Sequence, residues 1–210
     1  MDMSTLLLPE TVSEKLIYMS KNSDLSLYLF LLTNLKIVLY KYNNISNFAV
    51  GSPIYNTQNH KTFSNKFVAL VDKLEEGDSF KDYLLKIRET TINAYDNQEY
   101  SLNDIIRELI DSEIIKEQNL FKVVCLLANI HDKAIIDNYK NDLIVKFTRN
   151  EKNIELNILY NKDLFSNETI ELFINRYIYV LEQTINNPSE NIENISILSQ
   201  EEKEKILKYF

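Results

Sequence analysis

Few side chains in this sequence could serve as a general base. Its two histidines, His60 and His131, are far apart along the chain, and each stands in a polar stretch, TQNHKT and NIHDKA. A lone histidine in such a setting is most often a solvated side chain, so we predict that neither acts as a base. The neighbouring Asp132 does not change this prediction, because adjacent side chains rarely point toward each other.

The sequence also contains few residues that could act as a nucleophile or bind a metal ion. Cys125 lies in the apolar run LFKVVCLLANI, which is typical of a buried packing cysteine rather than a reactive thiol. Ser52 stands between Gly51 and Pro53 without the strand-turn-helix setting of a nucleophile elbow, so we expect it to pack or to form local hydrogen bonds. Two isolated glycines cannot make a phosphate-binding loop, and no Cys or His pair has zinc-site spacing.

Carboxylate pairs are present, but in segments rich in charge. Asp72 precedes Glu75 and Glu76, and Glu201 is followed by Glu202. Catalytic carboxylates require a shaped cleft, whereas charge-rich segments usually face water. We therefore predict that these side chains are solvent-facing, and the sequence predicts no catalytic residue, metal or bound cofactor in this chain.

Composition excludes two classes of partner. The formal charge of −8 and a pI near 4.9 argue against nucleic acid, since binding to phosphates requires clustered Lys and Arg. The longest apolar run, residues 27–32, is far too short to cross a bilayer, and the N-terminal MDMSTLLLPE lacks the features of a signal peptide. We predict a cytoplasmic protein that binds neither nucleic acid nor membrane.

Hydrophobic periodicity predicts an α/β domain with a mixed sheet of about five strands and flanking helices. Helices are expected over residues 11–22, 25–42, 80–95, 102–110 and 167–185 and from Glu201 onward. Strands are expected over residues 48–54, 67–74, 120–129, 143–148 and 154–160, followed by a short extended stretch at 195–199. The helix over 25–42 is apolar nearly all round and suits a core position, whereas those over 80–95 and 167–185 should each bury one face.

The segment FAVGSPIYNTQNH places one of only two glycines and one of three prolines two residues apart, at Gly51 and Pro53. Glycine permits close backbone approach, and proline ends a strand ladder. The other glycine, Gly77, stands in EEGDS, where it predicts a turn with a helix cap at Asp78 or Ser79.

These segments, taken in order, resemble the C-terminal half of the condensation domain of nonribosomal peptide synthetases, a member of the chloramphenicol-acetyltransferase-like superfamily. That family has a strand ending in Val-Gly-Thr-Pro and an Asn-Arg loop, which resembles Val50, Gly51, Ser52, Pro53 and Asn56 without the arginine. Its Gly-Asp-x-Ser-Phe turn is similar to residues 77–80, with one residue fewer.

Later motifs follow in the same order. The family's His-Gln-Asp-x-Pro-Phe-Glu motif is represented by residues 97–103, of which only Gln98 is retained, and its Asn-Pro-Leu-Phe-Gln-Val strand by residues 118–123, which include Phe121. The Tyr-Asn-x-Asp-Leu-Phe turn matches residues 160–165 completely. The tail ISILSQEEKEKIL is similar to the segment that leads into an adenylation domain, so the resemblance covers about residues 8–210.

The resemblance implies a fold, a set of positions and a set of partners. Residues 1–194 would be the C-terminal subdomain of a chloramphenicol-acetyltransferase-like fold, and residues 195–210 a linker toward an adenylation domain. The seam between lobes, or the tunnel wall, would include Gly51, Pro53, Asn56, Gln98 and Phe121. The interface with the adenylation domain would include Ile197, Leu198, Leu207 and Phe210. Any phosphopantetheine would be carried by a partner carrier domain.

The family's His-His-x-x-x-Asp-Gly motif, which acts on the attacking amine, does not occur in this sequence. Three hypotheses follow. The favoured one is a truncated, non-catalytic condensation subdomain that serves as a structural or docking platform next to an adenylation domain. The others are one half of a split enzyme, completed by an N-terminal condensation half, and a piece excised from a complete condensation domain that forms peptide bonds between carrier-bound thioesters.

Overall fold

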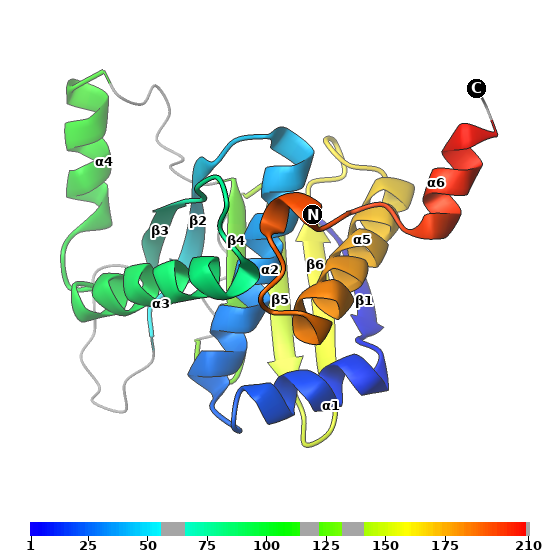
Figure 1. Cartoon of the computed structure of the whole chain (residues 1–210). Coiled ribbons are helices and arrows are strands. Elements are labelled where there is room, and N and C mark those ends of the chain that lie inside the picture. The colour runs from blue at the N-terminus through cyan, green and yellow to red at the C-terminus, as the bar shows by residue number, and fades with distance from the viewer. Residues whose placement is uncertain (56–65, 114–121, 132–140, 209–210) are drawn as a thin grey trace.

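The computed structural model describes residues 1–55, 66–113, 122–131 and 141–208. Its centre is a six-stranded sheet with the strand order β1-β6-β5-β4-β2-β3, covered on one face by helices (Figure 1). The strands are β1 (Asp2–Leu7), β2 (Asn47–Pro53), β3 (Phe67–Lys73), β4 (Val123–Leu127), β5 (Leu143–Arg149) and β6 (Ile154–Tyr160). No helix in these ranges is long and apolar enough to cross a membrane.

The sheet is mixed, as the sequence predicted. Strands β2, β4 and β5 run parallel to one another, whereas β1 with β6, β5 with β6 and β2 with β3 are antiparallel pairs. The expected number of about five strands was too low, because β1 was not anticipated. Its MSTLL sequence has no clear apolar alternation, and the strand is defined by its pairing with β6, from Asp2 opposite Tyr160 to Leu7 opposite Glu155.

The helices begin where local capping chemistry allows. They are α1 (Glu10–Met19), α2 (Asp24–Asn43), α3 (Phe80–Asp96), α4 (Leu102–Asp111), α5 (Asn167–Asn186), the short 3₁₀ helix η2 (Ile192–Asn194) and α6 (Gln200–Leu207). Side chains of Ser23, Ser79, Ser101 and Ser166 cap α2, α3, α4 and α5. Helix α1 starts directly after Pro9, without a side-chain cap, and Ser13 lies buried inside it.

Helix α2 is the centre of the core. It is buried nearly all round from Leu27 to Leu39, as predicted, with the sheet behind it and α3 and α5 on either side (Figure 1). Helices α3 and α5 each bury one face, as expected from their single apolar stripes. The turn before α3 contains Gly77 with φ of +84°, a left-handed conformation that favours glycine.

A buried ion pair joins α2 to the sheet. The ammonium of Lys36 pairs with the carboxylate of Asp72 on β3 and donates to the carbonyl of Leu70 at 2.9 Å, and the Tyr83 hydroxyl of α3 donates to the same carboxylate. Burial lowers the pKa of Lys36, and the Asp72 charge acts in the opposite direction. The prediction that Asp72 faces solvent was wrong, because its side chain is 3% exposed on the helix-covered face.

The tail stays attached to the domain beyond residue 194. Ile195 is only 2% exposed, Ile197 packs against the core, and the amide of Gln183 bonds to the backbone of Ser196 in both directions, at 2.8 and 3.1 Å. The stretch over 195–199, expected to be extended, pairs with no described strand; Ile195 has an extended backbone, and Ser196 is bonded by the side chain of Gln183. Helix α6 then stands at the side of the molecule (Figure 1).

The buried ion pair generates a stability prediction. Replacing Lys36 by Met leaves the Asp72 carboxylate buried without its counter-charge, and we expect a loss of about 3–5 kcal/mol in the free energy of unfolding. Urea unfolding measures it. The matched control is Lys86→Met, which removes a more exposed lysine paired with Glu75 and Asp78 and should cost less than about 1 kcal/mol. Equal losses in the two variants would contradict this assignment.

Candidate functional site

The structure gathers three of the predicted seam positions around the end of β2. Gly51 pairs with Val124 of β4, and Pro53 is the last residue of the strand. Beyond it, the side-chain amide of Gln98 accepts a hydrogen bond from the backbone N–H of Tyr55 at 2.9 Å. The predicted positions Asn56, Phe121 and Phe210, and also His60, lie outside the described residues. That these positions line a seam or tunnel stays a prediction.

A cluster of four polar side chains lies behind this strand end. The hydroxyl of Ser52 is 2.8 Å from the hydroxyls of both Tyr28 and Tyr95, and the Tyr95 hydroxyl is 2.7 Å from Nε2 of His131. Tyr28 belongs to α2, Tyr95 to α3 and Ser52 to β2, while His131 follows β4. The cluster therefore ties together four segments that are distant in sequence.

Hydrogen bonding fixes the tautomer of His131. Its Nδ1 accepts from the backbone N–H of Leu127 at 3.0 Å, so the ring proton is assigned to Nε2, which faces Tyr95. Tyr95 can then donate to Ser52, and Ser52 to the carbonyl of Pro53 at 3.2 Å. Burial lowers the pKa of His131 to about 3, so the ring is neutral near pH 7. A neutral ring with both nitrogens engaged is a poor general base.

The sequence did not reveal this cluster. His131 was expected to be solvated, which was wrong, because the chain turns back after β4 and leaves it 4% exposed. Ser52 makes the expected local bond to Pro53 but also bonds to the distant Tyr28 and Tyr95. Cys125 is buried, as predicted, and burial raises the pKa of its thiol. The only sequence signal was the apolar LLANI before the histidine.

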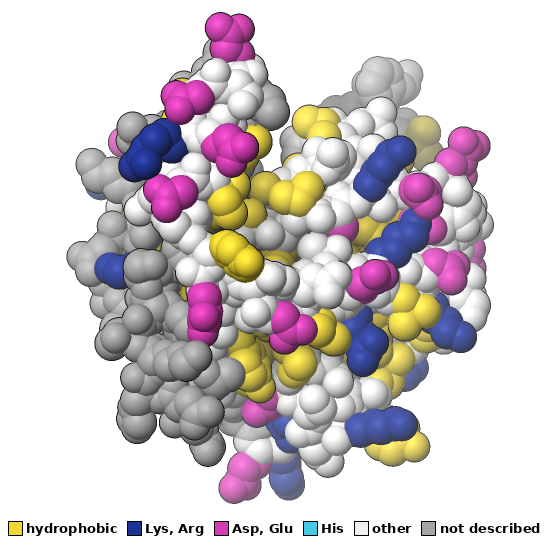
Figure 2. Space-filling view, turned by 90° about the vertical axis from the view of Figure 1, so that its left-hand side faces the viewer, with side chains coloured by type: hydrophobic (Ala, Val, Ile, Leu, Met, Phe, Trp, Pro, Cys, Tyr) yellow, Lys and Arg dark blue, Asp and Glu magenta, His cyan; other side chains and the backbone are white. Residues whose placement is uncertain are grey.

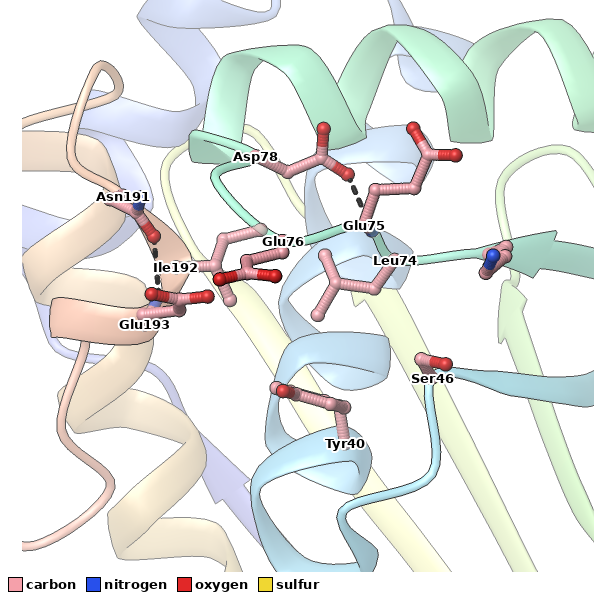
Figure 3. Close-up of a pocket in the computed structure, with 10 residues that line it drawn as sticks. Tyr40, Ser46, Leu74, Glu75, Glu76, Asp78, Asn191, Ile192 and Glu193 are labelled. Carbon is pink, nitrogen blue, oxygen red and sulfur yellow. Dashed lines mark hydrogen bonds between the residues drawn. The ribbon is translucent and has the colours of Figure 1, made fainter.

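A hollow of about 680 Å³ opens between the end of α2, the turn before α3 and η2 (Figure 3). Its walls carry the acidic side chains Glu75, Glu76, Asp78 and Glu193. Lys86 bridges Glu75 and Asp78 at 2.7 and 2.8 Å, and Glu75 and Glu76 are exposed, as predicted. Within the described ranges, no three His, Cys, Asp or Glu side chains are grouped as metal ligands. The charged side chains that line this hollow are mostly acidic.

A smaller hollow of about 260 Å³ lies between β3, the end of α3 and α4. Its walls include Phe67, Ala94, Leu102 and Ile105, and none of the residues of α4 is fully buried. Figure 2 shows this side of the molecule, with apolar side chains at the surface among acidic ones. Helix α4 thus contributes part of the apolar wall of this hollow.

The arrangement is that of a known family. The sequence matches the family described as Condensation domain over residues 1–207. The chain belongs to the condensation-domain family. It is 28% identical over 201 residues to gramicidin S synthase 2 of Brevibacillus brevis, and 28% identical over 218 residues to bacitracin synthase 1 of Bacillus licheniformis. These matches cover 87% and 95% of this condensation-domain chain but only 4% of each relative.

Solved structures confirm the fold. The first condensation domain of the CDA synthetase superposes with a TM-score of 0.75 at 13% identity, a match that covers 94% of this chain and 48% of that chain. A four-domain nonribosomal peptide synthetase, holo-AB3403, gives a TM-score of 0.79 at 13% identity, covering 96% of this chain and 18% of that one. The mixed sheet with flanking helices is therefore a condensation-domain architecture.

The neutral His131 generates a pH prediction. In the folded condensation domain it binds a proton only near pH 3, whereas an unfolded histidine binds one below about pH 6.5, so acid favours the unfolded state between these values. Its contribution to stability is present above pH 6.5 and is lost as the pH falls. From pH 7 to pH 5, we expect this group to lower the free energy of unfolding by about 2 kcal/mol.

Urea unfolding at both pH values measures this effect. The control is His131→Asn, because the amide oxygen can still accept from Leu127 but does not titrate. The variant should lose about 2 kcal/mol less than the parent over the same range. An identical pH dependence in the two proteins would show that His131 is not buried as a neutral ring.

Proposed function

We propose that this chain is the C-terminal half of a condensation domain and serves as a non-catalytic structural and docking platform beside the adenylation domain of a nonribosomal peptide synthetase. The non-catalytic role in this proposal rests on the hydrogen bonds and the neutral form of His131. Its two nitrogens are bonded to Leu127 and Tyr95, and burial keeps the ring neutral. A substrate amine would meet no available base there.

The assignment to one half of the domain rests on the share of a complete condensation domain that this chain matches. Nearly all of this chain is used in the match to the first CDA condensation domain, which extends over about half of that chain. The ordered motifs of residues 50–165 support the C-terminal half, and the sequence contains no His-His pair. A half domain of this kind supplies a folded surface without the histidine motif.

A docking role is supported by the geometry of α6. The first turn of α6 is held by the ion pair between Arg176 and Glu202 at 3.1 Å and by a reciprocal capping bond between Ser199 and Glu202. Its far end carries Leu207, which is 73% exposed. Another protein of this fold, the X-domain from teicoplanin biosynthesis, has been solved in complex with OxyB. Ile197 already packs on its own core, which leaves Leu198 and Leu207 for a partner.

One observation favours the alternative that this chain is one half of a split or excised enzyme. The sheet face opposite the helices carries an apolar row, Met3, Leu159, Ile144 and Val124, aligned by the strand register. Met3 at its outer end is 59% exposed, whereas Ile144 and Val124 are only 2% and 0% exposed. A second lobe, contributed by another chain or by the parent protein, would cover the exposed outer end of this row.

An activity assay separates these functions. The purified chain, given donor and acceptor carrier proteins loaded with aminoacyl phosphopantetheine thioesters, should form no peptide bond above the rate of the carriers alone. A complete condensation domain serves as the positive control. Turnover that is lost in His131→Ala would refute the non-catalytic assignment. Product formed only after addition of an N-terminal condensation half would favour the split enzyme.

The docking surface is tested with Leu207→Asp in the synthetase that contains this chain. Because an exposed apolar side chain at an interface contributes through burial, the aspartate should increase protease cleavage near residue 200 and lower the adenylation rate severalfold. The matched control is Leu164→Asp, another exposed leucine, at the turn before α5. Cleavage and rate equal to those of the parent protein would exclude docking through α6.

A further inference from the structure

A third hollow lies at the end of the domain where β4 and β5 begin. Its volume is about 350 Å³, within the range of roughly 300–1,000 Å³ in which proteins hold small molecules. Its floor and walls are mostly apolar and come from α2, the two strand starts, the turn before α5 and α5 itself, namely Leu39, Val123, Leu143, Phe165, Ile170 and Phe173. An apolar group of moderate size would fit between them.

Two opposite charges stand at the margin of this hollow. Lys122 precedes β4 and Asp142 precedes β5, and both line the cavity. The backbone N–H groups of Asp142 and Leu143 both donate to the carbonyl of Lys122, at 3.0 and 3.1 Å, which holds the two residues side by side. Neither side chain is ion-paired with a residue in the described parts of the chain. One cation and one anion are therefore available to a ligand.

The helix termini add partial charges of both signs. The last turn of α2 lines the hollow with Leu39, Tyr42 and Asn43, and the first turn of α5 with Thr169. A helix carries partial negative charge at its C-terminus and partial positive charge at its N-terminus. The hollow thus lies between a negative and a positive pole, at the end of the sheet where α2 finishes and α5 starts (Figure 1).

We propose that this hollow binds a free α-amino acid with an apolar side chain. The side chain lies among Leu39, Ile170 and Phe173, the ammonium group faces Asp142 and the end of α2, and the carboxylate faces Lys122 and the start of α5. A purely apolar ligand would leave both charges unused. A zwitterion satisfies each charge with its opposite.

This site is separate from the cluster around His131. The hollow is at the start of β4, whereas His131 follows the end of that strand, so the two lie at opposite ends of the parallel strands. Amino acid binding in this hollow therefore does not rest on the proposed function. A failure to bind would leave that function standing, and the reverse also holds. Ligand binding here would be detected in the isolated chain without any carrier protein.

Calorimetric titration of the purified chain with L-phenylalanine and L-leucine tests the proposal. We expect saturable binding of at least one of them at millimolar concentration or below. Two analogues remove one charge each, 3-phenylpropionate the ammonium and phenethylamine the carboxylate. Each should bind at least about tenfold more weakly than L-phenylalanine, because hydrogen bonds to charged groups are among the stronger ones.

Variants then locate the site. Lys122→Gln and Asp142→Asn should each weaken amino acid binding about tenfold, with unchanged circular dichroism. The matched controls are Lys152→Gln and Glu151→Gln in the exposed turn between β5 and β6, which should bind as the parent does. The proposal is overturned by no binding of either amino acid, by equal binding of the two analogues, or by parental affinity in the Lys122 and Asp142 variants.

Discussion

The fold depends on the burial of α2 on all sides. Three long polar side chains of this helix, Tyr28, Asn34 and Lys36, lie inside the protein and need partners there. Tyr28 bonds to Ser52 of β2, Asn34 accepts from Thr184 of α5 at 2.7 Å, and Lys36 pairs with the sheet. These bonds hold α2 against β2, α5 and β3, and the Asp72 carboxylate that pairs with Lys36 also accepts a hydrogen bond from Tyr83 of α3. The polar groups of a single helix thereby orient the sheet and α5 directly, and α3 through Asp72.

The sequence predicted those parts of the fold that local chemistry decides. Serine caps and apolar periodicity placed α3 and α5 almost to the residue, and the apolar circumference of α2 indicated its central position. Prediction from the sequence failed where the structure of a residue or segment depends on a partner far away in the chain. β1 exists because β6 pairs with it, and Asp72 is buried because Lys36 reaches it from another element. Neither partner can be read from the neighbouring residues.

The same limit applies to the candidate site. The order of family-like motifs led to Gly51, Pro53 and Gln98, which the structure gathers at one strand end. The one signal near His131, the apolar LLANI before it, was too weak to indicate a buried ring. The side-chain amide of Gln98 bonds to the main chain of Tyr55 and thereby holds the backbone beyond the end of β2. The polar centre is a set of internal hydrogen bonds that joins α2, β2, α3 and the segment after β4.

The pairing of β1 with β6 has a consequence for synthesis on the ribosome. Strand β1 has no partner until Ile154–Tyr160 has left the exit tunnel. Helix α5, which packs on α2, follows β6 in the sequence and leaves the tunnel later still. Such long-range pairing is slow to form and exposes apolar surface to other chains. The domain therefore completes its sheet and covers α2 only after β6 and α5 have both left the ribosome.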